Sequence, residues 1–165
     1  MRIAALDVYY LADATGAESG RAAAIVFDDW AAATPLSEHV VTVPDIAAYE
    51  PGAFYKRELP CLLAVLDGLD ADLVVIDGYV DLAPGRPGLG RHLHEATGLP
   101  VIGVAKTTFH EAVCVPVVRG GSARPLLVTS VGMPVEAAAA YVRGMSGENR
   151  VPTLLLKVDQ LSRGR

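Results

Sequence analysis

The chain has 165 residues, which suits one domain that buries roughly two-thirds of its unfolded surface. Its formal net charge of −5 excludes a generally basic surface, so a nucleic-acid partner would have to be held by a local patch. No apolar run reaches the ~18 residues that span a bilayer, and both cysteines lie in apolar runs typical of buried thiols. We expect a single cytoplasmic domain over residues 1–165.

The first part of the chain predicts an antiparallel meander followed by a helix. Three apolar runs are separated by connections that contain Gly, Ser or Asp, as expected for strands, and they cover residues 3–10, 21–28 and 39–43. From residue 58 to residue 66 leucines recur at helical spacing, and Gly68 lies near the expected helix end. This helix is expected to pack one apolar face on the sheet.

The second part predicts strands that alternate with helices. Residues 71–77 and 101–105 are almost entirely apolar, which is typical of buried central strands. The other expected elements are a helix at 89–97, strands at 112–118 and 125–129, and helices at 135–142 and 154–162. The predicted architecture is α/β, with a mixed sheet that is antiparallel in its first strands and then parallel, and with helices on both faces.

Charged residues stand where the expected central strands end. Asp7 and Asp77 close two apolar runs, and Lys106 follows a third. Ligands of open α/β sheets collect at the carboxyl ends of the strands. Glu58, in the first turn of the expected helix, is a further acid that lies between Asp7 and Asp77 in the sequence. Converging carboxylates repel one another, which favours a divalent cation between them. Mg²⁺ suits an oxygen-only ligand set, and it is a common agent of phosphodiester hydrolysis.

Each acid taken alone also has a simpler explanation. Asp77 and Gly78 suit a turn, and an acid in a first helical turn is favoured by the helix dipole, which accounts for Glu58. Asp7 lies within an apolar run, where an unpaired carboxylate is costly to bury. Asp7 therefore shifts the balance toward a functional site, although spacing alone leaves both interpretations open.

Four segments together resemble the endonuclease V (deoxyinosine 3′-endonuclease) family, whose members nick nucleic acid near deaminated adenine. Residues 49–60, YEPGAFYKRELP, are similar to the family's Tyr-Pro-Gly and Arg-Glu signature. Residues 5–10 resemble its first strand with the catalytic aspartate, 74–78 its second aspartate motif, and 102–106 its strand that ends in lysine. Because the motifs occur in the same order along nearly the whole chain, the sequence is identified as a divergent short member.

The resemblance implies a ribonuclease H-like fold and Mg²⁺-dependent hydrolysis, with Mn²⁺ as a possible substitute. It implies that Asp7, Glu58 and Asp77 are catalytic metal ligands, with Asp159 as a further ligand near the metal. Lys106 would lie near the scissile phosphate, where its charge offsets developing negative charge. The partner would be inosine-containing DNA or RNA, in nucleic-acid repair or inosine processing, and we expect a monomer.

The resemblance also implies a set of substrate-binding residues. Tyr49 and Pro51 would form a wedge that parts the strands, where an aromatic face stacks on bases. Gly78 and Tyr79, with the loop 84–90 that contains Arg86, would form the pocket for a flipped hypoxanthine. Arg57, next to Glu58, is expected to contact the substrate.

Four residues depart from the family pattern. Tyr79 and Val80 replace a His-Gly pair, Ala83 replaces a loop histidine, and Met133 replaces the histidine after a later glycine turn. Val80 is expected to crowd a pocket that needs a close approach of the backbone. Two alternatives therefore stay open: a non-catalytic module that binds nucleic acid or a protein, and a nuclease of altered specificity. Retention of all three acids favours catalysis.

Overall fold

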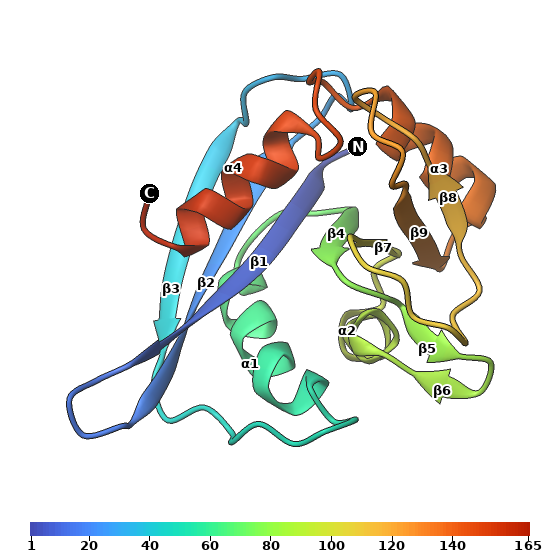
Figure 1. Ribbon diagram of the computed structural model, residues 1–165. Coiled ribbons are helices and arrows are strands. Elements are labelled where there is room, and N and C mark those ends of the chain that lie inside the picture. Colours follow the sequence, from blue (N-terminus) through green and yellow to red (C-terminus); the bar gives the residue numbers. More distant parts are fainter.

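The computed structural model describes residues 1–165 and is built around a seven-stranded sheet with helices on both faces (Figure 1). In chain order the elements are β1 (Ile3–Ala12), β2 (Glu18–Phe27), β3 (Ser37–Val43), α1 (Tyr55–Leu66), β4 (Leu73–Asp77), β5 (Asp81–Ala83), β6 (Arg86–Pro87), α2 (Leu89–Thr97), β7 (Val101–Ala105), β8 (Val115–Val117), β9 (Leu126–Val131), α3 (Val135–Gly144) and α4 (Thr153–Ser162). None of these helices combines the length and the apolar character that crossing a membrane requires.

The sheet has the strand order β3-β2-β1-β4-β7-β9-β8. Its centre is parallel, because β4 pairs with β1 on one side and with β7 on the other. Both flanks are antiparallel: β2 and β3 beside β1, and β9 and β8 beside β7. The expected mixed α/β architecture is confirmed, but the parallel part is confined to the centre, since β9 runs antiparallel to β7.

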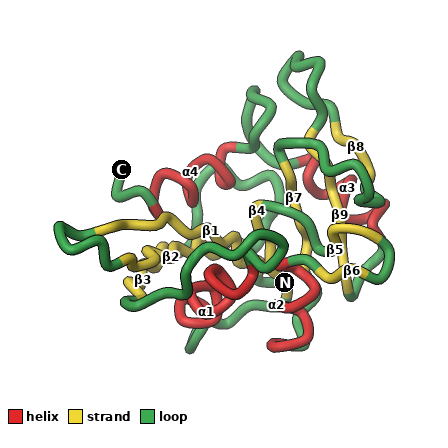
Figure 2. The backbone as a smooth tube through the Cα atoms, turned by 60° about the horizontal axis from the view of Figure 1, so that its bottom comes forward, coloured by secondary structure: helices red, strands yellow, loops and turns green.

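Alternation along the strands separates two hydrophobic cores. In β1, Ile3 and Ala5 face the core formed with α3 and α4, whereas Ala4 and Leu6 face the core formed with α1 and α2. Successive side chains of a strand point to opposite faces, so one apolar run contributes to both layers. Helices accordingly cover both faces of the sheet (Figure 2).

Several element boundaries differ from the sequence-based expectations. Helix α1 begins at Tyr55 rather than Glu58, which places Pro60 inside it. The expected strand 112–118 is reduced to the three residues of β8. The loop after β4 contains the short β5-β6 hairpin, which was not expected because Pro and Gly dominate that stretch.

The loop after β4 lies directly on β7, at Gly103. A Cβ atom on Gly103 would come within 2.5 Å of the Gly78 carbonyl oxygen and 2.6 Å of Thr129 Oγ1. The Val80 amide donates to the same Thr129 oxygen at 3.0 Å. Gly78 itself has a φ of 117°, which side chains rarely allow. The path of the chain after Asp77 therefore depends on the absence of side chains at both glycines.

We predict that Gly103→Ala lowers the free energy of unfolding by about 1–3 kcal/mol, because the added methyl group displaces the loop that carries Gly78. The matched control is Gly144→Ala in α3, where nothing lies within 4 Å of the added Cβ. The control is expected to raise stability by up to about 1 kcal/mol, the usual preference for Ala over Gly in a helix. Urea unfolding of both variants measures the difference, and equal stabilities would contradict the close approach.

Candidate active site

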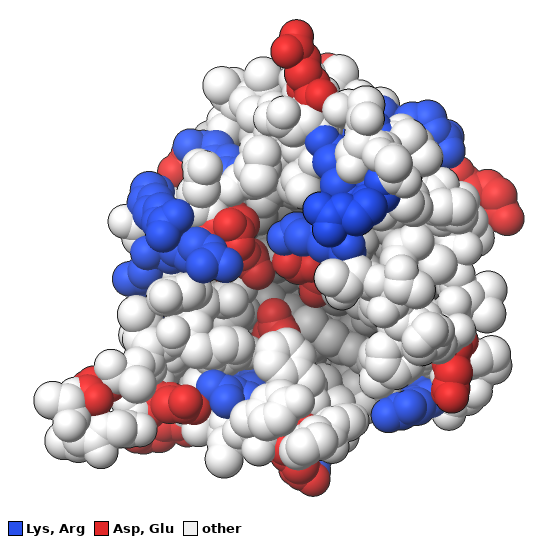
Figure 3. Space-filling model, viewed as in Figure 1, with Lys and Arg blue, Asp and Glu red and all other residues white.

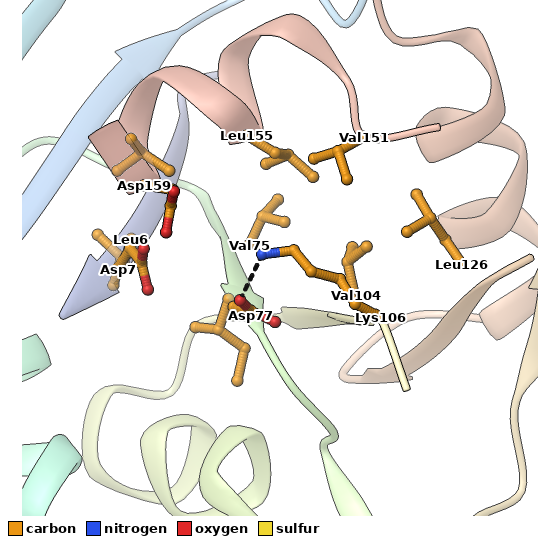
Figure 4. Close-up of a pocket in the computed structure, with 12 residues that line it drawn as sticks. Leu6, Asp7, Val75, Asp77, Val104, Lys106, Leu126, Val151, Leu155 and Asp159 are labelled. Atoms are coloured by element: carbon orange, nitrogen blue, oxygen red, sulfur yellow. Dashed lines mark hydrogen bonds and ion pairs between the residues drawn. The ribbon is translucent and has the colours of Figure 1, made fainter. Parts of the chain in front are cut away.

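The two strand-borne acids lie where the central strands part. Pairing of β1 with β4 runs from Ile3 and Leu73 to Leu6 and Ile76, so Asp7 and Asp77 come next on either side. Both belong to the odd-numbered set that faces α3 and α4, as Ala5 and Val75 do. Lys106 directly follows β7, and it lines one cavity together with Asp7 and Asp77 (Figure 4). The structure thus brings these three predicted site residues together.

Helix α4 contributes a second carboxylate beside Asp7. The Asp159 side chain lies next to that of Asp7 (Figure 4), and a hydrogen bond with Asp159 contributes to raising the pKa of Asp7. Ser162, one turn further along α4, donates from Oγ to the Asp159 carbonyl at 2.8 Å, and the same Oγ lies 3.4 Å from Asp7 Oδ2. Arg163 donates from Nε to Asp159 Oδ1 at 3.2 Å. The tertiary structure therefore places Asp159 at the site, where the sequence motif around it is weak.

Glu58 reaches the site from α1, the layer on the other face of the sheet. It is 7% exposed, and neither a hydrogen bond nor a positive charge lowers the pKa of its carboxyl group. Burial raises the pKa of Glu58 to about 8, and the charges of Asp7 and Asp77 add to the effect. Burial likewise raises the pKa of Asp7 to about 7, with Asp77 the next cause. Asp7 of β1 and Asp77 of β4 are therefore close enough to Glu58 of α1 to raise its pKa.

Lys106 is the cation of this cluster. Its Nζ lies 2.8 Å from Asp77 Oδ2. Burial lowers the pKa of Lys106, but the nearby carboxylates of Asp77, Asp7 and Asp159 outweigh burial and raise it. Lys106 is therefore held as a cation at neutral pH, and its charge offsets only part of the acidic cluster.

The carboxylates fit a divalent cation by their chemistry but are not arranged as a finished metal cage. No group of three or more His, Cys, Asp or Glu side chains lies close enough together to hold an ion as it stands. The donor set is nevertheless entirely oxygen, which Mg²⁺ and Ca²⁺ prefer. Buried Glu58 has no counter-charge of its own, and a cation would relieve the repulsion that raises its pKa.

Two cavities meet at Asp77. The smaller comprises about 350 Å³ of space, open solvent included, between the strand ends and α4, and Asp7, Asp77, Lys106 and Asp159 line it (Figure 4). The larger comprises about 830 Å³ of open space beside α1 and the β5-β6 hairpin. Its lining includes Glu58, Asp77, Gly78, Tyr79, Arg86 and Phe109. A ligand in the larger cavity therefore lies next to the acidic cluster.

Aromatic side chains form one wall of the larger cavity. The Tyr79 hydroxyl donates to the Thr107 carbonyl at 2.6 Å and accepts from the Phe109 amide at 3.1 Å. The two rings lie 6.2 Å apart, and the Arg86 guanidinium lies 5.9 Å from the Phe109 ring centre. Sequence analysis did not identify Phe109; its one signal is an aromatic residue just after the strand that ends in Lys106.

The expected wedge residues are on the surface. Tyr49 is 63% exposed, and its ring meets Phe54 edge-on at 6.4 Å. Pro51 is also exposed, in a segment without helix or strand that leads into α1. Their role in parting strands stays a prediction.

Arg57 is largely buried, and its expected contact with the substrate stays a prediction. Its side chain is 9% exposed, with Nη2 2.7 Å from Glu18 Oε2. The guanidinium also lies 4.4 Å from the centre of the Tyr10 ring. Because the guanidinium pairs with Glu18 of β2 and lies on the Tyr10 ring of β1, Arg57 fixes α1 against the β1-β2 hairpin. Arg57 thereby positions the neighbouring Glu58.

The expectation that Val80 crowds the pocket is wrong. Val80 is 1% exposed and belongs to the core beneath α1 and α2, and it lines neither cavity of the site. Its side chain packs on Gly90 of α2, where an added Cβ would meet Val80 Cγ2 at 2.8 Å. His92, on the same helix, stacks on Tyr55 with 3.7 Å between ring centres, which is a packing role.

The face of the molecule that carries the acids is hollowed. Acidic side chains lie at the bottom of the hollow, with lysine and arginine side chains on either side of it (Figure 3). A negative floor with positive margins suits a cation below and a polyanion above. Although the chain has a net charge of −5, positive side chains thus gather locally beside the acids.

The fold and this cluster define an α/β protein with an acidic, metal-type site at the carboxyl ends of its central strands. The family model described as Endonuclease V matches residues 1–152. Endonuclease V of Streptomyces avermitilis is 35% identical over 166 residues, covering 86% of this chain and 72% of the relative. That of Xanthomonas oryzae pv. oryzae is 40% identical over 113 residues, covering 67% and 47%. The chain belongs to the endonuclease V family.

Solved structures agree with this assignment. The crystal structure of endonuclease V from Streptomyces avermitilis has a TM-score of 0.80 and 31% identity, covering 99% of this chain and 80% of that one. The endonuclease V of Ciona intestinalis, in complex with a 24mer DNA containing an inosine followed by a ribo-adenosine, has a TM-score of 0.75 and 18% identity, covering 99% and 84%. At 18% identity, the similarity to the Ciona intestinalis structure shows the shared fold alone.

We predict that the metal-free protein loses stability as pH rises from about 4.5 to about 8. The folded-state pKa of Glu58 is raised from 4.5 to about 8, so the folded state holds this proton more tightly than the unfolded state. The stability that the protonated Glu58 contributes is fully present below the unfolded-state pKa of 4.5, and it is lost as pH rises through the folded-state pKa of about 8. Glu58→Gln should flatten this dependence, measured by thermal unfolding in the presence of a chelator.

The control for that experiment is Glu136→Gln, which removes the same charge from an exposed position in the first turn of α3. Identical pH profiles for wild type, Glu58→Gln and the control would refute the repulsion between acids at the site.

We predict that Val80→Gly, which restores the family glycine, destabilises the protein by roughly 2–4 kcal/mol, because it removes a fully buried side chain and adds backbone freedom. It should not improve cleavage of inosine-containing oligonucleotides, since Val80 lies outside both cavities. Urea unfolding and a cleavage assay test the two parts. A gain in cleavage with unchanged stability would restore the original expectation of a crowded pocket.

Proposed function

We propose that the protein is a metal-dependent endonuclease that hydrolyses a phosphodiester bond near inosine in DNA or RNA, in nucleic-acid repair or inosine processing. The observation that carries the proposal is the meeting of Asp7, Glu58, Asp77 and Lys106 at the edge of an aromatic-walled cavity. The chain spans 72% of one curated relative and 47% of another, so the activity of the whole relatives is extended to this chain as part of the proposal.

The acids would hold the cation, with Mg²⁺ as the expected ion and Mn²⁺ as a substitute. Asp7 and Asp77 come from adjacent strands, Glu58 from α1 and Asp159 from α4. When bound, such an ion lowers the pKa of a water molecule and offsets the charge of a phosphate. Lys106 supplies a further positive charge beside Asp77, where negative charge grows on the scissile phosphate.

The larger cavity would receive the altered base. A base inside a duplex or stacked strand must be turned out before a pocket can read it. Tyr79 and Phe109 offer aromatic surface for stacking, and Arg86 lies on the same wall. The related Ciona intestinalis enzyme was crystallised with DNA that contains an inosine, which supports this choice of substrate.

The residues that depart from the family pattern bear on the alternatives. Val80 and Ala83 are buried, and Met133 packs against the core formed with α3 and α4. None of these three lines either cavity of the site, and Tyr79 is the departure that does. This distribution favours catalysis over a binding-only module. It also favours altered base specificity as the second candidate function, because Tyr79 replaces an imidazole in the cavity wall.

We predict that the protein nicks DNA or RNA oligonucleotides with a single inosine in Mg²⁺ or Mn²⁺, and that Asp77→Asn lowers the rate at least about 100-fold. Removing a residue that only hydrogen-bonds to a metal ligand already lowers metal affinity or activity by about 10- to 100-fold, and removing a ligand should lower the rate further. Asp77→Asn keeps the shape of the side chain beside Lys106. The measurement is gel analysis of labelled strands, with matched oligonucleotides that carry adenosine in place of inosine.

The control variant is Asp67→Asn, an exposed residue after α1 that lines neither cavity. It should cleave as wild type does. Cleavage of adenosine and inosine strands at equal rates would support altered specificity. If the folded protein cuts neither DNA nor RNA with either ion, the endonuclease proposal is wrong.

A further inference from the structure

A third cavity lies beside Lys106. It comprises about 540 Å³ of open space, and its lining is Lys106, Thr107, Thr108, Arg124, Pro125, Leu127 and Arg150. Three of these residues are cations, two carry hydroxyl groups, and none is acidic. They come from the end of β7, from the turn between β8 and β9, and from the connection between α3 and α4. Chain segments far apart in sequence thus converge on one cationic cavity.

Arg150 ties these segments together. Its Nε donates to the Arg124 carbonyl at 2.9 Å, and its Nη2 donates to the carbonyls of Lys106 and Pro125 at 2.6 and 3.0 Å. All of these partners are backbone oxygens, and no carboxylate neutralises the guanidinium. Arg150 therefore acts as a positioning residue that holds Lys106 and Arg124 on one cavity while keeping its own positive charge.

Arg124 is exposed and forms no ion pair. Other cations near the acidic cluster differ in this respect: Arg163 pairs with Asp159, and Lys157 pairs with Glu38. Arg124 and Arg150 thus lie without carboxylate partners on a cavity whose lining contains no acid. Guanidinium groups and hydroxyls are the side-chain donors that bind phosphate oxygens.

The three cavities follow one another in order. The larger aromatic cavity and the acidic cavity share Asp77, and the acidic cavity and the cationic cavity share Lys106. A strand whose altered base occupies the first cavity and whose scissile phosphate lies at Lys106 would continue into the third. The phosphate that follows the scissile one would then meet Arg124 and the hydroxyls of Thr107 and Thr108.

We propose that this cationic cavity is a phosphate subsite for the substrate strand beyond the scissile bond, with Arg124 as the contacting residue. The inference rests on the proposed function for the direction of the strand, but the recognition of a backbone phosphate does not depend on the base. Binding at the subsite would hold the strand on the far side of the cleaved bond from the flipped base. The subsite would therefore fix the position of the strand relative to the acids, in addition to strengthening its binding.

Arg124→Gln tests the proposal, with Arg143→Gln as the matched control. Arg143 is equally exposed, lies in the last turn of α3, and lines none of the three cavities. Binding of inosine-containing and plain single-stranded oligonucleotides is measured by fluorescence anisotropy in Ca²⁺ over a tenfold range of salt. Loss of one phosphate contact on a single strand should reduce the slope of log affinity against log salt by about 0.7.

Over that range the affinity of wild type is thus expected to fall about 5-fold more than that of Arg124→Gln. The control should keep the wild-type slope. Strands that carry one uncharged methylphosphonate, moved stepwise along the chain, locate the contact. Wild type should lose affinity at one position beyond the scissile phosphate, Arg124→Gln should be insensitive there, and Arg124→Lys should recover part of the sensitivity.

The outcomes separate the subsite from the enzymatic proposal. Equal slopes and equal methylphosphonate profiles for Arg124→Gln and Arg143→Gln overturn the subsite, even if wild type cleaves at inosine. A slope change specific to Arg124 on plain strands, without cleavage at inosine, supports the subsite and rejects the enzyme. If wild type binds no oligonucleotide at all, both proposals are wrong.

Discussion

Mutual repulsion among carboxyl groups in a partly buried space is the constraint on which the rest of this structure depends. Glu58 and Asp7 both have raised pKa values because burial withdraws water from them and neighbouring acids add their charge. Lys106 offsets part of that charge through its 2.8 Å contact with Asp77. A fold that keeps these groups together without a bound cation loses stability at neutral pH, which is understandable if the cluster serves to bind one.

Each part of the scaffold serves to hold that cluster. Pairing of β1 with β4 ends at Leu6 and Ile76, so the next residues, Asp7 and Asp77, lie side by side at the parting strands. The ion pair of Arg57 with Glu18 fixes α1, which brings Glu58 from the opposite face of the sheet. The absence of a side chain at Gly103 lets the chain after Asp77 lie on β7. Stability and site geometry are therefore supported by the same contacts.

The surroundings of the cluster differ on its two sides, and the difference suits a nucleic-acid strand. One side is an aromatic cavity with Tyr79 and Phe109, where a base can stack. The other side is a cationic cavity with Arg124 and Arg150, where a phosphate can bind. The acids lie between them, at the place where the bond would be cut. Arg150, which donates only to backbone carbonyls, couples the position of Lys106 to the cationic side.

By itself the sequence determined the mixed α/β class, the antiparallel strands at the start of the chain, the helices that follow them and the candidate acids, because apolar periodicity and strand-end charges are local signals. The tertiary structure alone decided which side chains meet. It buried Arg57, which was expected at the substrate, and Val80, which the family comparison placed in the pocket, and it brought Asp159, Phe109 and the Arg124–Arg150 pair to the site. Nothing local in the sequence brings Arg124 and Arg150 together beside Lys106, because their positions depend on how chain segments far apart in the sequence pack against one another.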